Sequence, residues 1–521
     1  MGSIDNFAWS EVSPGRWERD TDEIENFYLA LDRQYAETGR HYFAIMGHIS
    51  VSVEVPSNRR PEECEDRLEL ALQAAWVRLR FDHPTIASWV EYTGRQPRKV
   101  YECGGPYPSR KDYLKIWLDS TFRSISTDKT GLEWCNADPP VPKLPTLFLL
   151  KTPESLANGL KRQIVRRDLV LRAPHDIIDG IGTLLFFNNF LKHAAEAYSS
   201  SNNNPPPAWG SEHHNLSPSF RIAASLPNAI SPQQLARIED ITASNAALRR
   251  DLPTLSIPFN AISPTPGKHQ RASLTLPSDQ TALILAACRA RSLTVTQAYH
   301  TAIAMAVRDS HKPSQQPTPT LKRYINYSLI NERRHCKHPY NTPSHAAAVY
   351  HSTSGAHLAL DLEVPGMLSS SSPRTPEDDK ADFARLAPIV RDYYTSIRND
   401  ASHPPLVPHY FTLATPKDPR IKDSSPSNPP PLPPPNETPS VSISSFGRMD
   451  DLISAKHGGV LEVGDPWVTG EELGTGLGVF LGTFGGELGL SAAFNEAFHT
   501  ESEVRGFLER LQEIVTCVLD C

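Results

Sequence analysis

The sequence predicts a mixed α/β enzyme built as two lobes. The chain has 521 residues, which is more than one domain of about 100–200 residues usually holds. Segments with helical periodicity and segments rich in β-forming residues occur in both halves of the chain. A stretch rich in proline, asparagine and serine separates the halves. We therefore expect an N-terminal lobe over residues 1–205, a linker over 206–225 and a C-terminal lobe over 226–521.

The N-terminal half contains two predicted strands and two predicted helices. Residues 49–55 alternate in hydrophobicity as a strand does, and residues 164–171 form a run rich in β-branched residues. Between these strands, residues 61–81 carry apolar side chains at helical spacing, for example at Leu68, Leu72 and Leu79. Residues 180–198 have the length and period of a second helix.

The C-terminal half shows the same mixture. Residues 279–290 and 296–307 are predicted helices, and either Thr294 or Thr296 is placed to cap the second of them. The other predicted elements are strands at 324–329, 346–351 and 441–445, a hairpin over 479–494 that turns at Gly485–Gly486, and a closing helix over 501–519. Proline clusters among the 47 prolines of the chain; the densest cluster predicts a surface loop over residues 424–440.

Composition excludes several classes of function. The chain has 52 Lys and Arg against 59 Asp and Glu, a formal net charge of −7, whereas binding to nucleic acid needs clustered positive charge. The mean hydropathy is −0.39, and no apolar run approaches the ~20 residues that span a bilayer. The N-terminus lacks the basic and apolar regions of a secretory signal, so we expect a cytoplasmic protein.

The seven cysteines do not indicate disulfides or a metal site. Their number is odd and no CxxC pair occurs, which is typical of reduced thiols. Cys336 lies near His335 and His338, but this cluster lacks the paired spacing of a zinc site. We expect no bound metal.

The stretch LVLRAPHDIIDGIGTLL, residues 169–185, carries the predicted chemistry. Pro174 ends the β-rich run, so His175 directly follows a strand, where a side chain can face a cleft. An imidazole with a pKa near neutrality suits general-base catalysis. Asp179 and Gly180 begin the following helix, whose free N–H groups hold a carboxylate. We expect Asp179 to fix the loop and pair with a cation, and Asp176 to bond within the loop or face solvent.

His175, Asp179 and Gly180 fit the HxxxDG signature of the CoA-dependent acyltransferase superfamily, which includes plant BAHD enzymes, chloramphenicol acetyltransferases and the condensation domains of peptide synthetases. Four further segments resemble motifs of this superfamily in the same order: residues 80–88, 292–307, 441–448 and 485–498. Among its branches, the chain most resembles the fungal trichothecene 15-O-acetyltransferase-like enzymes.

The resemblance implies two chloramphenicol-acetyltransferase-like lobes with an active-site tunnel between them. It implies an O-acyltransferase, with acetyl-CoA or another acyl-CoA as co-substrate, no bound cofactor, and a small alcohol, such as a hydroxylated terpenoid, as acceptor. His175 would be the general base. By analogy, Ser442, Ser444 and Ser445 are candidates for stabilising the oxyanion or binding substrate, and Arg333, Arg334 and Arg448 are candidates for the cation beside Asp179.

The sequence also departs from parts of this superfamily. Residues 461–467, LEVGDPW, stand where BAHD enzymes carry DFGWG, which argues against a plant-type enzyme. Pro174 precedes His175 where condensation domains usually carry a second histidine. Two alternatives stay open: a condensation- or release-type transferase that takes its thioester from a carrier protein, and a cyclase or binding protein with the same fold. Because one chain would hold both lobes, we expect a monomer.

Overall fold

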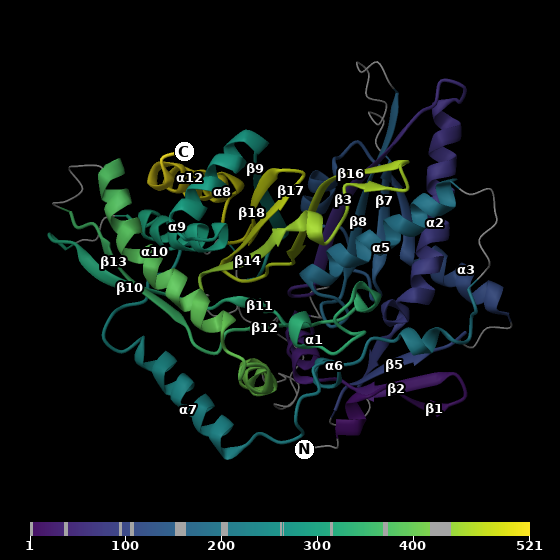
Figure 1. Cartoon of the computed structure of the whole chain (residues 1–521), viewed down its shortest axis with the longest axis horizontal. Helices are drawn as coiled ribbons and strands as arrows, with labels where there is room; N and C mark the ends of the chain where they lie inside the picture. The colour runs from purple at the N-terminus through teal and green to yellow at the C-terminus, as the bar shows by residue number, and fades with distance from the viewer. Residues whose placement is uncertain are drawn as a thin grey trace.

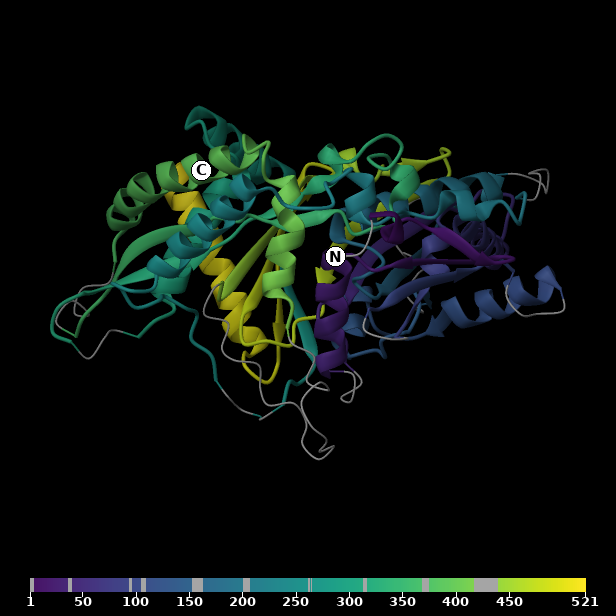
Figure 2. The same ribbon diagram turned by 90° about the horizontal axis from the view of Figure 1, so that it is seen from below.

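A computed structural model describes residues 4–35, 40–92, 96–104, 109–151, 163–199, 207–260, 263, 265–312, 316–367, 374–416 and 439–521. The protein has two halves that lie side by side, each built from a sheet with helices packed on it (Figure 1). Helices α1 (Glu23–Tyr35) and α11 (Val407–Ala414) pack against each other at the junction of the halves (Figure 2).

The N-terminal half is organised around a six-stranded sheet with the order β15-β16-β3-β8-β7-β6. Its central strands are β3 (Ile45–Glu54) and β8 (Ile164–Ala173), which pair antiparallel over their whole length. Helices α2 (Pro61–Asp82) and α5 (Gly180–Ser199) pack together with this sheet. Their apolar stripes meet in one core, where Trp76 lies edge-on to Phe186 and Phe190.

The C-terminal half is organised around a four-stranded sheet with the order β14-β17-β18-β9. Strands β14 (Val441–Arg448) and β17 (Leu477–Phe484) pair parallel, while β18 (Glu487–Asn495) pairs antiparallel with β17 and with β9 (His269–Leu276). Helices α9 (Val295–Asp309) and α12 (Glu501–Leu519) share the core of this half. Side chains on α9 are almost all buried, because α9 is surrounded by α10, α12, β13 and β14.

The remaining elements either complete the six-stranded sheet, as β6, β7, β15 and β16 do, or lie around the two sheets. They are β1 (Ser10–Ser13), β2 (Arg16–Asp20), β4 (Trp89–Glu91), β5 (Arg98–Glu102), α3 (Arg110–Thr121), β6 (Phe122–Ser126), α4 (Gly131–Asn136), β7 (Thr146–Lys151), α6 (Phe220–Ala223), α7 (Pro232–Ala247), α8 (Ser278–Ala290), β10 (Thr320–Asn326), β11 (Leu329–Asn331), β12 (His351–Thr353), β13 (Leu358–Val364), α10 (Pro376–Arg398), β15 (Lys456–His457) and β16 (Leu461–Gly470).

One strand crosses from the C-terminal half to the N-terminal half. Strand β16 leaves the C-terminal half and pairs antiparallel with β3, with a register shift between Gly464 and Trp467. Residues 456–470, which the sequence assigns to the C-terminal lobe, therefore lie in the sheet of the N-terminal half. The predicted linker is also packed rather than extended over the surface, since Phe220 on α6 is 1% exposed.

Most predicted elements occur in the structure with small changes at their ends. Helices α2, α5, α8, α9 and α12 and strands β3, β8 and β14 coincide with predicted segments. Thr294 is the residue that caps α9, accepting a hydrogen bond from the Gln297 amide at 3.2 Å. The predicted hairpin is β17–β18, and Gly485 and Gly486 both have positive φ, as a tight two-residue turn requires.

Two predicted strands are wrong. Residues 346–350 form turns, and only His351 begins a strand, so the alanine-rich run 346–348 is buried without pairing. The strand predicted at 324–329 is interrupted, because β10 ends at Asn326 and β11 begins at Leu329. Of the predicted proline-rich loop, residues 424–438 lie outside the described residues.

Several features of the described residues bear on the nature of the site. No helix there combines the length and the apolar character needed to cross a membrane. The seven cysteines, all within the described ranges, are free thiols. Over the same ranges, no three His, Cys, Asp or Glu side chains are grouped as metal ligands would be.

Candidate active site

His175 lies in a turn between β8 and α5 and faces an internal cavity of about 300 Å³. The Ile177 amide donates to the Pro174 carbonyl at 3.2 Å, which closes this turn directly after the strand. The cavity is lined by both halves: α1, β3 and the start of α5 on one side, and β11, β12, α11 and β14 on the other. The predicted placement of His175 at a strand end beside a cleft agrees with this geometry.

Two aromatic side chains surround the His175 ring. Tyr28 on α1 stacks against it, with ring centroids 3.7 Å apart and an interplanar angle of 10°. His351 on β12 lies with its ring centroid 5.5 Å from that of His175. The Tyr28 hydroxyl and His351 Nε2 are hydrogen-bonded at 2.8 Å. The imidazole is therefore fixed in orientation by a residue from each half of the chain.

His175 is uncharged at neutral pH. Burial lowers its pKa to about 3, and the neighbouring His351 acts in the same direction, while backbone hydrogen bonding and Asp179 oppose these effects only in part. Burial lowers the pKa of His351 as well. A neutral imidazole has a free lone pair and can accept a proton, which is the state that a general base needs.

Asp179 lines the cavity, but both of its carboxylate oxygens are bound by the protein. Its Oδ1 accepts from the Gly182 amide at 2.7 Å, and its Oδ2 accepts from Arg333 Nη1 and from the Tyr350 amide, both at 2.8 Å. Burial on its own raises the pKa of this carboxyl, but Arg333, His351 and the Gly182 amide outweigh it, so the pKa lies below its usual value. Asp179 is thus an ionised cap on α5.

The sequence suggests three arginines as partners of Asp179, and in the structure Arg333 is the one that lies beside it. The ion pair is buried, with side chains 7% and 4% exposed. The Arg448 side chain is 70% exposed and lies beside Asp451, and Arg334 Nε lies 2.9 Å from Nε2 of the adjacent His335. The suggestion of Arg334 or Arg448 as the partner of Asp179 is therefore wrong.

Two glycines allow the close packing of this loop. A Cβ added at Gly180 would lie 2.9 Å from the Phe446 ring, and a Cβ at Gly182 would lie 2.4 Å from the Ala346 carbonyl oxygen. Any side chain at Gly182 would push the turn away from the segment that carries Arg333. The glycine of the HxxxDG signature is explained here by its contact with Phe446.

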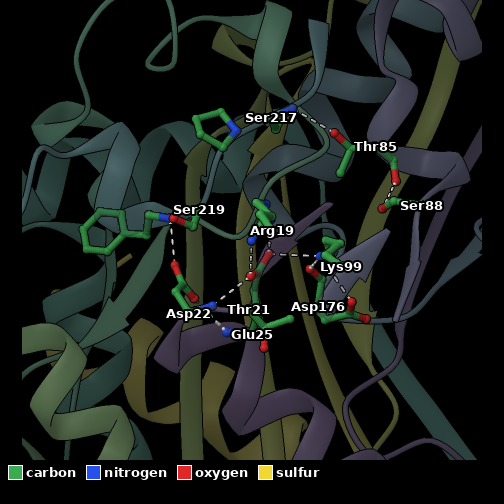
Figure 3. A network of polar contacts seen from close by, with 12 residues as sticks. Arg19, Thr21, Asp22, Glu25, Thr85, Ser88, Lys99, Asp176, Ser217 and Ser219 are labelled. Atoms are coloured by element: carbon green, nitrogen blue, oxygen red, sulfur yellow. Dashed lines mark hydrogen bonds and ion pairs between the residues drawn. The ribbon is translucent and has the colours of Figure 1, made fainter. Parts of the chain in front are cut away.

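A second buried network holds the other side of the loop (Figure 3). Lys99 Nζ lies 3.2 Å from Asp176 Oδ2 and also donates to the Asp176 carbonyl. The same ammonium donates to Glu25 on α1 at 2.9 Å, and Arg19 binds both oxygens of Glu25, at 2.6 and 2.7 Å. Asp176 is buried and its carboxylate pairs with Lys99 on β5, so the expectations that it bonds within the loop or faces solvent are both wrong.

The network extends to the segment that joins the halves. Asp22 accepts from the amides of Ile24 and Glu25 at the start of α1, and its second oxygen accepts from the Phe220 amide at 2.7 Å. In Figure 3, Asp22 and Ser219 lie on one side of Glu25, with Lys99 and Asp176 on the other. The loop of His175 is thus connected through charged groups to α1 and to residues 217–220.

Ser442, Ser444 and Ser445 on β14 all line the cavity of His175. Ser442 and Ser444 share one face of the strand, as residues two apart do, and Ile443 points into the core. Ser445 Oγ lies 2.8 Å from Thr296 Oγ1 on α9. The register shift between Ser445 and Gly447 places Phe446 in a bulge at the same wall.

A smaller cavity of about 100 Å³ lies next to the first. The two cavities share Phe446, Val468 and Phe480 as lining residues. Arg271 lines the smaller cavity, 8% exposed, with its guanidinium 4.3 Å from the centre of the Trp467 ring. Burial lowers the pKa of Arg271 to about 10, and its guanidinium has no ion pair within the described ranges.

Sequence reasoning missed four residues that line these cavities: Tyr28, His351, Glu472 and Arg271. Tyr28 lies on a helix that was not predicted, and His351 ends a segment that was predicted as a longer strand. Glu472 and Arg271 lie at strand ends or in strands without any motif around them. Spatial proximity joins them to His175, and single-sequence patterns do not report such proximity.

Comparison with known proteins gives one family and several relatives. Residues 49–354 match the model of the family described as 15-O-acetyltransferase Tri3. The acetyltransferase pigO of Monascus ruber is 25% identical over 346 residues, which is 66% of this chain and 67% of that protein. The O-acetyltransferase pigM of the same organism is 24% identical over 347 residues, and the match spans 60% of its length and 66% of this chain.

Two solved structures share the fold. The trichothecene 15-O-acetyltransferase TRI3 from Fusarium sporotrichioides superposes with a TM-score of 0.75 and 16% identity, covering 98% of both chains. The first condensation domain of the calcium-dependent antibiotic synthetase gives a TM-score of 0.57 and 13% identity, covering 95% of both chains. The predicted mixed α/β architecture of the chloramphenicol-acetyltransferase type is thereby confirmed.

The buried ion pair predicts a large loss of stability when it is broken. We expect Arg333→Ala to lower the free energy of unfolding by about 3–5 kcal/mol, because it leaves the Asp179 carboxylate buried without its cation. Arg448→Ala is the matched control and should change the unfolding free energy by less than about 0.5 kcal/mol, since this side chain is exposed. Denaturant unfolding of both variants measures the difference; equal stabilities would contradict the assignment of Arg333.

Proposed function

We propose that this chain, which belongs to the 15-O-acetyltransferase Tri3 family, is an acyl-CoA-dependent O-acyltransferase that transfers an acetyl group to a hydroxyl of a small secondary metabolite. That it is an acyltransferase follows from the family and from the relatives named above. The proposal adds the donor, the acceptor class and the chemistry of the site. The observation that carries it is a neutral imidazole, His175, facing a cavity lined by both halves of the chain.

In the proposed reaction His175 is the general base. The imidazole accepts the proton of the acceptor hydroxyl while the hydroxyl oxygen attacks the thioester carbonyl carbon. The carbonyl π electrons move to oxygen and form a tetrahedral oxyanion. When the carbonyl re-forms, the C–S bond breaks and the leaving thiolate takes the proton from the imidazolium, which regenerates His175. Holding both substrates in one cavity supplies proximity, which lowers the barrier without any covalent enzyme intermediate.

The hydroxyls on β14 are candidates for binding the oxyanion. Ser442, Ser444 and Ser445 line the same cavity as His175, and a hydroxyl donor preorganised toward the developing charge stabilises the transition state. Ser445 is already hydrogen-bonded to Thr296 and so is held in place. Asp179 is a positioning residue in this scheme, because its oxygens are occupied by Arg333 and two amides.

Two adjacent cavities support a donor and an acceptor that meet at His175. Acetyl-CoA carries a long arm with carbonyl and phosphate acceptors, and the buried Arg271 guanidinium lies in the smaller cavity without an acidic partner among the described residues. We place the donor arm on this side. A terpenoid acceptor is suggested by the trichothecene activity in the family's relatives, and one chain supplies both sides of the cavity, so we propose a monomer in the cytoplasm.

Three donors test the proposal and its alternative, a transferase that uses a carrier protein. The purified chain is incubated with a panel of hydroxylated terpenoids and with acetyl-CoA, acetyl-pantetheine or an acetylated acyl carrier protein. We expect ester formation and thiol release with acetyl-CoA, and a higher KM with acetyl-pantetheine. Turnover only with the loaded carrier protein would favour the alternative, and thiol release without an ester would contradict both.

Removing the base is expected to abolish most of the activity. His175→Ala should lower kcat by 10²-fold or more, equivalent to about 2.7 kcal/mol or more in barrier height. Its melting temperature should stay close to that of the parent, because His175 lies partly open to a cavity and forms no ion pair. Steady-state kinetics and a thermal melt decide the matter, and a folded His175→Ala variant with parental kcat would end the general-base assignment.

The lowered pKa of His175 predicts the pH dependence of the rate. A lowered pKa keeps the imidazole unprotonated below its ordinary value of about 6.5, so log(kcat/KM) should show no inflection there as pH falls. The acid limb should appear only at lower pH. The cavity also contains Glu472, and burial raises the pKa of this carboxyl to about 7. An inflection near pH 6.5 that persists in folded Glu472→Gln would therefore contradict the assignment.

Acid unfolding is the control for this profile. Burial lowers the pKa of His83 to about 4 and that of His269 and His300 to about 3. Below pH 6.5 the unfolded chain binds protons at these positions that the folded chain does not, so stability falls as pH falls toward these pKa values. Fluorescence or circular dichroism at each pH separates loss of fold from titration of the base.

A further inference from the structure

Glu472 is a buried acidic residue in the cavity of His175 for which the proposed reaction has no use. It lies two residues after Gly470, the last residue of β16, and it lines the 300 Å³ cavity. The residue is 5% exposed. The Asp179 carboxylate, by comparison, is explained as the cap of α5, so Glu472 is the carboxyl of this cavity that still requires a role.

The carboxyl of Glu472 is held by one of its two oxygens. Oε1 accepts from the Tyr42 hydroxyl at 3.0 Å and from the Gly474 amide at 2.6 Å. Its own amide donates to His269 Nδ1 at 3.0 Å, which fixes the backbone. The Leu473 amide also lowers the pKa of this carboxyl by hydrogen bonding. Oε2 takes part in neither the Tyr42 nor the Gly474 hydrogen bond, and it belongs to a side chain that lines the cavity.

The neighbouring residue, Glu471, is a buried carboxyl with a cationic partner. Glu471 points to the other side of the chain and pairs with Arg172 at 2.7 Å. Glu472 forms no ion pair within the described part of the chain. Burial without a cation raises the pKa of Glu472 to about 7. A ligand that donates a hydrogen bond to this carboxyl offsets part of the free-energy cost of burying it.

The rest of the wall shows what kind of molecule would reach this oxygen. Aromatic and aliphatic side chains, among them Phe27, Phe43 and Phe411, form much of the cavity wall, and polar side chains that include His351 and the β14 serines form the rest. Tyr327 also lines it, and Glu472 contributes to raising the pKa of the Tyr327 hydroxyl, which places the two groups near each other. The cavity thus combines apolar surface with polar groups, of which Glu472 is a carboxyl without an ion pair among the described residues.

We propose that Glu472 Oε2 accepts a hydrogen bond from a second hydroxyl of the acceptor, so that the preferred acceptor is an apolar molecule carrying two hydroxyls. This inference rests on the proposed function and adds the acceptor class. One hydroxyl reacts at His175 and the other is bound by Glu472, which sets which hydroxyl is acylated. A site built to bind a hydroxyl discriminates strongly against the analogue that lacks it, because the carboxyl is then left unpaired.

The probes are three alcohols of equal chain length: an α,ω-alkanediol, the ω-methoxyalkanol and the 1-alkanol, in a series from four to twelve carbons with acetyl-CoA as donor. The diol can donate to Glu472, the methoxy compound can only accept, and the alkanol does neither. Assays at pH 8.5 keep the carboxyl ionised and therefore an acceptor alone. For the best chain length we expect kcat/KM of the diol to exceed that of both other compounds at least tenfold.

The variant Glu472→Gln inverts this preference in a defined way. Tyr42 and Gly474 both donate, so the amide oxygen must replace Oε1 and the NH₂ group faces the cavity as a donor. The ω-methoxyalkanol should then approach the diol to within about threefold, and both should exceed the 1-alkanol. Glu462→Gln, on the strand β16 that precedes Glu472 but exposed and paired with Lys456, is the matched control and should leave all ratios unchanged.

A binding measurement separates failure of this inference from failure of the proposed function. The shift in melting temperature with each probe is measured without donor, for the parent and for Glu472→Gln. If no alcohol is acetylated but the diol still stabilises the parent more than the other probes, the proposed reaction is wrong and the recognition by Glu472 stands. If alcohols are acetylated or bound with no diol preference, or if folded Glu472→Gln keeps the parental ratios, the inference is overturned.

Discussion

The ion pair between Asp179 and Arg333 is the contact on which the geometry of the site depends. The two residues are 154 positions apart and come from opposite halves of the chain. Asp179 caps α5 through the Gly182 amide and at the same time binds Arg333 and the Tyr350 amide. The turn that carries His175 is therefore fixed to the segment that carries His351. Because the pair is buried, neither charge can exchange its partner for water without a large desolvation penalty.

The buried charges around the site are arranged so that none of them reaches the His175 ring directly. Lys99 neutralises Asp176 and Glu25 on one side of the loop, and Arg333 neutralises Asp179 on the other. The imidazole itself contacts Tyr28 and lies beside His351, both uncharged at neutral pH. Burial then dominates its pKa. In the proposed mechanism such an imidazole stays unprotonated until it takes a proton from the acceptor hydroxyl.

The sequence allowed the local parts of this site to be predicted and left out the parts that depend on folding. Pro174 and the β-rich run before it placed His175 at a strand end, and Asp179–Gly180 placed a helix start after it, because both effects act within a few residues. Arg333 could be named only among three arginines, since all three are equally basic in sequence and differ only in burial. Residues 456–470 were included in the C-terminal lobe and no strand was predicted there, because their position in the sequence does not state which sheet they join. Residues 346–350 were predicted as a strand, since a run of small apolar residues fits a buried strand and a buried turn equally well.

The crossing of strand β16 between the halves explains why Glu472 lies at the cavity although no sequence motif surrounds it. Strand β16 is paired with β3 until Gly470, and the chain must then return to β17 in the other half within a few residues. Two glutamates lie at this return and point in opposite directions, as successive residues of an extended chain do. Glu471 is bound by Arg172, which precedes His175 by three residues on β8. Arg172 therefore restrains the backbone of this return relative to the strand that precedes His175. A restrained backbone limits how far Glu472 can move from His175, which the proposed selection of one hydroxyl of a diol requires.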